Sequence, residues 1–171
     1  LDAHLQHADV VLRMGNGVFS HMLASFNRRD KSWSHSGIVM VEHGYPFVYH
    51  CSGGENDSTP CVRRDSAIRF FSPVYNMGAA VVRYQLPDTV KERMAAIVHA
   101  YRRSRPVFDT RFDLRTDSAL YCTEFVWKTI TRAMGDSTWV PTSVAGTRRF
   151  AGTDDLFLNP HARMVWQVRY K

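Results

Sequence analysis

Hydrophobic and polar positions recur along this chain with two different periods. Apolar residues spaced three or four apart predict amphipathic helices over residues 17–26 and 88–103, and a third that follows Cys122 and ends at Gly135. Alternating or continuous short apolar runs predict five β-strands, over residues 9–14, 37–41, 47–50, 79–84 and 163–170. Residues 139–157 follow neither period and are expected to be irregular. This order of elements favours the α+β class, with helices flanking a mostly antiparallel sheet.

The last predicted helix begins close to a cysteine. Asp117 and Ser118 precede Cys122 and are residue types that cap helix starts, and Gly135 is the residue type that ends helices. A thiol in a first helical turn meets unpaired backbone N–H groups and the positive end of the helix dipole, which favour the thiolate. The same N–H groups can stabilise an oxyanion. The alternative interpretation is a small buried hydrophobic residue.

Two histidines are placed on the predicted hairpin formed by residues 37–41 and 47–50. His35 opens the first strand and His50 closes the second, on either side of a turn near Gly44. Adjacent antiparallel strands bring such ends together, so His50 is expected to orient the ring of His35. The register is not fixed by the sequence, and each histidine taken alone is also compatible with a structural or surface role.

Composition limits the classes of protein and of partner. The 171 residues are 44% hydrophobic and contain no linker-like tract, so residues 1–171 are expected to form one domain. The 22 Lys and Arg against 16 Asp and Glu give a formal charge of +6, which favours anionic partners, including anionic lipid. No nucleic-acid-binding motif accompanies the charge, so no specific nucleic-acid partner is expected. The chain starts at Leu1 without a signal-peptide pattern, which suggests a processed or truncated form that lacks its address signal.

The three cysteines cannot all pair within one chain. Cys51 and Cys61 lie ten residues apart around a turn-rich stretch and could form a disulfide if the protein is exported. That pairing would leave Cys122 as the free thiol. No Cys-x-x-Cys or His-x(3–5)-His spacing accompanies the cysteines, so no metal site is expected.

Several short sequence motifs, taken in order, resemble those of the permuted NlpC/P60 enzymes of the YiiX/YaeF type. They are Asp9-Val10-Val11-Leu12, Ser34-His35-Ser36-Gly37-Ile38-Val39, Val48-Tyr49-His50, Phe112-Asp113-Leu114 and Tyr121-Cys122-Thr123-Glu124-Phe125-Val126. The resemblance extends over nearly the whole chain, although each motif is short. It implies a papain-like fold in which circular permutation places the histidine before the cysteine.

The resemblance also implies roles for individual residues. Cys122 matches the family's nucleophile and His35 its general base. His50 falls where the family has a third polar residue, which varies and is often glutamate. Glu42 competes for that role on the same hairpin, but it lies next to the turn and is expected to be too far from His35.

Two residues close to Cys122 are also expected to have roles. Tyr121 is expected to contribute to an oxyanion site next to the Cys122 N–H, whereas Glu124 is expected to brace the helix start. The chemistry needs only a Cys–His pair. A thiolate attacks an amide or ester carbonyl, and the imidazolium protonates the leaving group. We expect the thiolate–imidazolium pair to prevail at neutral pH and no metal or organic cofactor to be required.

The substrate is less defined than the chemistry. The family commonly cuts stem peptides of bacterial peptidoglycan, so a cell-wall cysteine peptidase or amidase is the leading hypothesis, periplasmic or secreted. Delivery into a rival bacterium as an antibacterial effector is consistent with it, and any inhibitor or immunity protein is unknown.

Two other functions stay open. The family is also similar to lipid-acting acyltransferases of the lecithin:retinol type, so a lipid ester or N-acyl bond is the alternative. A non-catalytic module that binds lipid or wall fragments is the third hypothesis. Pocket shape discriminates the first two, because an open polar cleft suits a peptide and a deep apolar one suits an acyl chain. Four apolar residues would support the acyl alternative if they lined a groove, but they could equally belong to the core: Phe19, Met22, Phe70 and Phe71.

Overall fold

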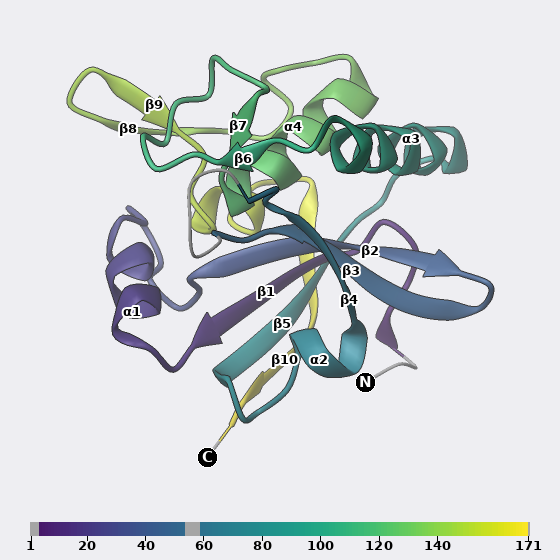
Figure 1. Ribbon diagram of the computed structural model, residues 1–171, viewed down its shortest axis with the longest axis horizontal. Coiled ribbons are helices and arrows are strands. Elements are labelled where there is room, and N and C mark those ends of the chain that lie inside the picture. Colours follow the sequence, from purple (N-terminus) through teal and green to yellow (C-terminus); the bar gives the residue numbers. More distant parts are fainter. Residues whose placement is uncertain (1–3, 54–58, 171) are drawn as a thin grey trace.

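The computed structural model describes residues 4–53 and 59–170 of the chain. A six-stranded sheet in the order β10-β5-β1-β2-β3-β4 runs through the middle of the molecule (Figure 1). Every neighbouring pair in this sheet is antiparallel. Its strands are β1 (Val10–Gly15), β2 (His35–Glu42), β3 (Tyr45–Cys51), β4 (Val62–Ser66), β5 (Asn76–Tyr84) and β10 (Ala162–Arg169).

Helices cover both faces of the sheet. The long helices α3 (Asp88–Ser104) and α4 (Cys122–Met134) lie over one face, and the short helix α2 (Ala67–Phe70) lies on the other (Figure 1). Successive residues of a strand point to opposite faces, so β1 supplies Val10 and Leu12 to the larger core under α3 and α4. Its Val11 belongs to the smaller core beside α2. Helix α1 (Val18–Ser25) lies at one end of the molecule.

Shorter elements surround the start of α4. A parallel pair, β6 (Val107–Phe108) and β7 (Ala119–Leu120), leads into the helix, and an antiparallel hairpin of β8 (Ser143–Ala145) and β9 (Arg148–Phe150) follows it. A turn of 3-10 helix at Asp154–Leu156 precedes β10. The expected α+β class with a large antiparallel sheet flanked by helices is thus confirmed.

Most expected elements are present, but the structure also contains short elements that were not expected, among them α2, β6 and β7. Strand β4 was not expected, because its residues are mainly charged, and the region predicted to be irregular contains the β8–β9 hairpin. In α1 the apolar side chains of Val18 and Met22 are exposed to solvent, as is that of the C-cap residue Phe26, while Ala24 is buried. An apolar stripe at helical spacing indicates a shared face, but it does not say that protein covers that face.

Two further expectations from the sequence concern the disulfide and the membrane-spanning segments. Cys51 and Cys61 form a disulfide with a Cα–Cα distance of 4.8 Å, and Cys122 is free. Residues 54–58 of the intervening turn-rich stretch, like Leu1, lie outside the described residues. Within the described part of the chain, no helix combines the length and the apolar character that crossing a bilayer requires.

Candidate active site

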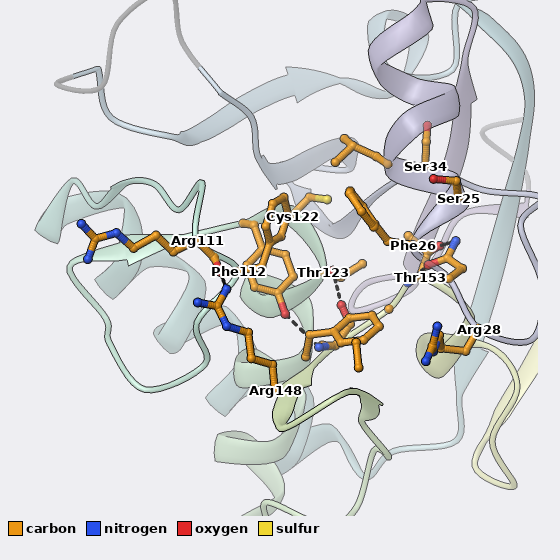
Figure 2. A pocket seen from close by; sticks show the side chains of 17 residues that line it. Ser25, Phe26, Arg28, Ser34, Arg111, Phe112, Cys122, Thr123, Arg148 and Thr153 are labelled. Carbon is orange, nitrogen blue, oxygen red and sulfur yellow. Dashed lines mark hydrogen bonds between the residues drawn. The ribbon is translucent and has the colours of Figure 1, made fainter.

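The candidate nucleophile lies at the start of α4. The helix begins at Cys122, and the Glu124 carboxylate accepts a hydrogen bond of 3.2 Å from the Tyr121 N–H, which closes the first turn. Cys122 is 6% exposed, and its sulfur faces a cavity (Figure 2). The thiol therefore lies at the positive end of a helix dipole, next to backbone N–H groups that have no partner within the helix.

Three side chains from neighbouring strands form a hydrogen-bonded chain. His35 opens β2, His50 lies near the end of β3, and Asp65 lies in β4. His35 Nε2 is 2.9 Å from His50 Nδ1, with the two rings nearly perpendicular. His50 Nε2 is 3.2 Å from Asp65 Oδ2. The structure thus brings together the two histidines expected from the sequence and adds a carboxylate behind them.

The carboxylate determines which ring nitrogens carry protons. The hydrogen bond from His50 lowers the pKa of Asp65, so Asp65 is ionised near neutral pH and can only accept. His50 must then donate from Nε2, which makes its Nδ1 an acceptor. His35 consequently donates from Nε2, and its Nδ1 has no hydrogen. Nδ1 of His35 is therefore the basic nitrogen, the one able to take a proton from a thiol.

A glycine makes room for this arrangement. Strands β2 and β3 pair with Ile38 opposite Tyr49. A Cβ at Gly37 would lie 2.9 Å from the carbonyl oxygen of Tyr49 and 3.1 Å from Cβ of His50. Glycine at this position lets the two strands approach closely enough for the ring of His50 to reach that of His35.

Burial opposes charge on both reacting groups. Burial lowers the pKa of His35 well below 6.5, and the nearby charges of Arg13 and His50 lower it further. Burial also raises the pKa of Cys122 above 9.0, although backbone hydrogen bonds and Arg13 act in the opposite direction. Desolvation of both groups thus favours a thiol and a neutral imidazole in the free site and opposes the thiolate–imidazolium pair expected from the sequence.

Arg13 is a charged residue of the site that sequence reasoning did not identify. It is the register partner of His35 in the β1–β2 pair. Its guanidinium lies 4.7 Å from the centroid of the Phe70 ring, and Nη1 donates to the Phe70 carbonyl oxygen at 3.5 Å. Its positive charge disfavours an imidazolium at His35 but favours a thiolate at Cys122. Arg13 is therefore placed to stabilise negative charge at Cys122.

Cys122 borders two adjoining cavities, which share Leu23 and Ser34. The smaller, of about 190 Å³, is also lined by Arg13 and His35, and we call it the histidine cavity. The described contacts include no hydrogen bond between Cys122 and His35. The two side chains face the same cavity, and in free enzymes catalytic hydrogen bonds are often long until substrate binds.

The larger cavity, of about 260 Å³, has a different lining. We call it the apolar cavity because most of its lining surface is apolar, and its hydrophobic lining residues include the following: Leu23, Phe26, Phe112, Ala145, Phe150 and Ala151. In Figure 2, Arg111 and Arg148 lie on one side of it and Arg28 on the opposite side. A substrate bound against Cys122 would therefore place an apolar group inside and meet cationic side chains around it.

Tyr121 also borders the apolar cavity. Its hydroxyl accepts a hydrogen bond of 2.8 Å from the Ala151 N–H, and burial raises its pKa well above 10. The phenol therefore keeps its own proton, which it can donate. Tyr121 and Cys122 are thus adjacent in the chain and line the same space, as a contribution to an oxyanion site requires.

The other candidates from the sequence have partners elsewhere. Glu42 accepts a hydrogen bond from Tyr49 and pairs with Arg64, and it takes no part in the histidine chain. Asp117 does not cap α4 but forms an ion pair with Lys128. Because Lys128 also pairs with the buried carboxylate that closes the first turn of α4, this network stabilises the helix that carries the thiol.

Asp65 had no signal in the sequence. It follows two arginines in an edge strand without apolar alternation, so neither its strand nor its face could be recognised. Arg13 was included in a predicted strand, but its neighbourhood to His35 depends on the pairing of β1 with β2. Both residues reach the site through strand order, which is a long-range property.

The arrangement of the histidine, cysteine and carboxylate side chains bears on metal binding. The facing nitrogens of His35 and His50 are at hydrogen-bonding distance and do not converge on a common point. In residues 4–53 and 59–170, no group of three or more His, Cys, Asp or Glu side chains is arranged to hold a metal ion. The site residues described here do not fit a metal centre.

No protein-family model matches the sequence, and no curated protein matches it. Among solved structures the chain is similar to YiiX from Escherichia coli O157:H7, described as a metalloprotein of the DUF1105 group. The TM-score is 0.77 at 15% sequence identity, covering 98% of this chain and 99% of that chain. The chain therefore has a YiiX-like fold.

Proposed function

We propose that the protein is a cysteine hydrolase in which Cys122 is the nucleophile and His35 the general base. His50 and Asp65 position His35, in a permuted papain-like arrangement with the histidine ahead of the cysteine. The observation that carries the proposal is the chain from Asp65 through His50 to His35, which leaves Nδ1 of His35 basic in a cavity that Cys122 also lines. Together with Cys122, these hydrogen-bonded side chains correspond to a nucleophile, a general base and groups that orient the base.

The reaction follows from these groups. Nδ1 of His35 takes the Cys122 proton as the sulfur attacks the substrate carbonyl, and the N–H groups at the start of α4 with Tyr121 stabilise the oxyanion. The imidazolium then protonates the leaving amine or alcohol, which departs and leaves a thioester on Cys122. Water loses a proton to His35 as it attacks the thioester, and the acid and the free thiol are regenerated.

The apolar cavity favours an acyl group as the part of the substrate that enters next to Cys122. Its mostly apolar lining surface and its volume of about 260 Å³ suit a hydrocarbon chain better than the polar side chains of a peptide. A lipid ester or an N-acyl amide is therefore the substrate class that we favour. A transferase outcome follows if an alcohol or amine replaces water in the second step.

A peptidoglycan stem peptide is the second candidate. The observation in its favour is the set of arginines around the cavity, Arg28, Arg111 and Arg148, because stem peptides carry carboxylates. This function would place the protein in the periplasm or outside the cell, where the Cys51–Cys61 disulfide is favoured. Delivery as an antibacterial effector is compatible with that location.

A series of p-nitrophenyl esters tests the acyl hypothesis. Each methylene buried contributes about 0.8 kcal/mol, so kcat/KM should rise roughly fourfold per methylene from acetate upward until the cavity is full. Cys122→Ala and His35→Ala should abolish turnover, whereas His21→Ala, in an exposed histidine, should not. Activity that persists in a folded Cys122→Ala variant would refute the cysteine mechanism.

Digestion of purified peptidoglycan separates the two candidates. Wild type and Cys122→Ala are incubated with sacculi, and the soluble products are identified by mass spectrometry. Stem-peptide fragments released by wild type alone, together with no dependence on ester chain length, would favour the cell-wall function. Strong chain-length dependence without such fragments would favour the acyl function.

A further inference from the structure

Helix α1 presents hydrophobic side chains to solvent. Val18, Phe19, Met22 and Phe26 are 88%, 59%, 45% and 50% exposed, and they recur at the three- and four-residue spacing of one helix face. Within the helix only Ala24 is buried. A contiguous exposed apolar face is unusual on a soluble protein and marks a surface that another molecule covers.

Arginines without acidic partners lie near this face. Arg28 lies three residues after the end of the helix at Ser25, and Arg111 and Arg148 lie on the opposite side of the apolar cavity (Figure 2). Arg149 is the neighbour of Arg148 in β9. In the described part of the chain, none of the four forms an ion pair with a carboxylate. Arg29 differs, because it pairs with Asp155. Unpaired guanidinium groups around an apolar face fit an anionic, apolar partner.

Both features meet at the entrance to the candidate active site. Helix α1 and the β8–β9 hairpin lie at the same end of the molecule, the left in Figure 1, and residues of both line the apolar cavity. Val144 of the hairpin is itself 54% exposed. A surface that contacted α1 and the hairpin together would therefore lie over the mouth of the cavity that leads to Cys122.

We propose that α1 and the β8–β9 hairpin form a docking surface for an anionic lipid bilayer. The apolar face of α1 enters the boundary between headgroups and acyl chains, and the arginines contact lipid phosphates. This geometry delivers an acyl chain from the bilayer to the apolar cavity without passage through water. The link to substrate delivery rests on the acyl function proposed above, whereas the docking itself does not.

Charge and chemistry select a bilayer over a protein partner. Three exposed hydrophobic side chains on a helix of eight residues, with Phe26 at its C-cap, make a narrow strip, which fits shallow insertion better than the wide interface of a stable protein complex. The basic side chains beside the strip match a surface whose charge is uniformly negative.

Vesicle sedimentation with the catalytically inert Cys122→Ala protein tests the docking. Vesicles of phosphatidylcholine alone are compared with vesicles of phosphatidylcholine and phosphatidylglycerol. We expect binding to the anionic vesicles, weakened about tenfold or more by Val18→Ser with Met22→Ser, since both side chains lose their buried apolar area. Arg149→Gln should weaken it about fivefold. Ile68→Ser removes a 77% exposed apolar residue on α2 and should have no effect.

The outcomes separate docking from catalysis. Absence of binding to anionic vesicles would overturn the docking proposal, and so would equal losses from the α1 double variant and from Ile68→Ser. Hydrolysis of a soluble ester by otherwise wild-type protein is measured in parallel, and Val18→Ser with Met22→Ser should leave it unchanged because neither residue lines a described cavity. Ester hydrolysis without vesicle binding would refute docking alone, and binding without hydrolysis would refute the hydrolase alone.

Discussion

Replacing Asp65 by asparagine tests the proton arrangement of the site. A carboxylate at position 65 can only accept, which keeps the proton of His50 on Nε2 and leaves Nδ1 of His35 free to act as a base. An asparagine can rotate and donate its N–H to His50 instead. The tautomers of both histidines then reverse, and Nδ1 of His35 carries a hydrogen.

The expected loss follows from the strength of one hydrogen bond. A hydrogen bond to an ionised group contributes about 1.5–3 kcal/mol. The Asp65–His50 contact of 3.2 Å is partly shielded, since His50 is buried and Asp65 is half-buried. If that contribution is what holds the productive tautomer, kcat/KM should fall about 10- to 150-fold. KM should change little, because Asp65 does not line the cavities next to Cys122.

Steady-state hydrolysis of a p-nitrophenyl ester measures this loss, and ¹⁵N chemical shifts of the histidine rings report the tautomers directly. Arg69→Gln is the matched control, because it removes the other ionic partner of Asp65, at 3.6 Å, and leaves the contact with His50. We expect that control to retain wild-type activity. A folded Asp65→Asn protein with wild-type kcat/KM, or with unchanged histidine tautomers, would refute the reasoning.

Four further predictions concern stability and pH. Gly37→Ala should lower the free energy of unfolding by about 1–3 kcal/mol and reduce activity, since its Cβ would press on the backbone and on His50, whereas Gly17→Ala, with open space, should be nearly neutral in thermal denaturation. Ultraviolet titration of the Cys122 thiolate should show a midpoint above pH 9, and a step below pH 7 would contradict the neutral pair. Burial lowers the pKa values of His35 and His50 in the folded protein, so the unfolded chain takes up protons at a higher pH than the folded protein does. The free energy of unfolding, measured with denaturant, should therefore fall as the pH drops below 6.5. Alanine at both cysteines of the disulfide should cost about 2–3 kcal/mol for the ten-residue separation, and an unchanged midpoint of chemical unfolding would show that the bond contributes nothing.

Local pattern was enough for most secondary structure. The helix that follows Cys122 was recognised because its buried face recurs at helical spacing and Gly135, with φ of 74°, ends it. The hairpin that carries His35 and His50 was recognised because its apolar strands are separated by a short turn. Strand β4 was missed, since charged residues at the edge of a sheet carry no alternation of apolar and polar positions.

The environment of the site could not be predicted in the same way. Whether the thiol ionises depends on how deeply α4 and β2 bury it, and the apolar side of α1 was assigned without knowing that no other element covers it. Periodicity defines a face of an element, whereas burial depends on which other elements pack there. Asp65 and Arg13 reach the histidines only through the pairing of β4 with β3 and of β1 with β2.

The sequence by itself therefore determined most of the order of elements, the nucleophile and base candidates, and which two cysteines could pair if the protein is exported. These properties depend on neighbours within a few residues. Only the tertiary structure decided the hydrogen-bonded chain through the histidines, the burial of Cys122, and the lining of the cavity beside it. Those properties arise from distances between strands and from exclusion of water, which side chains far apart in the sequence produce together.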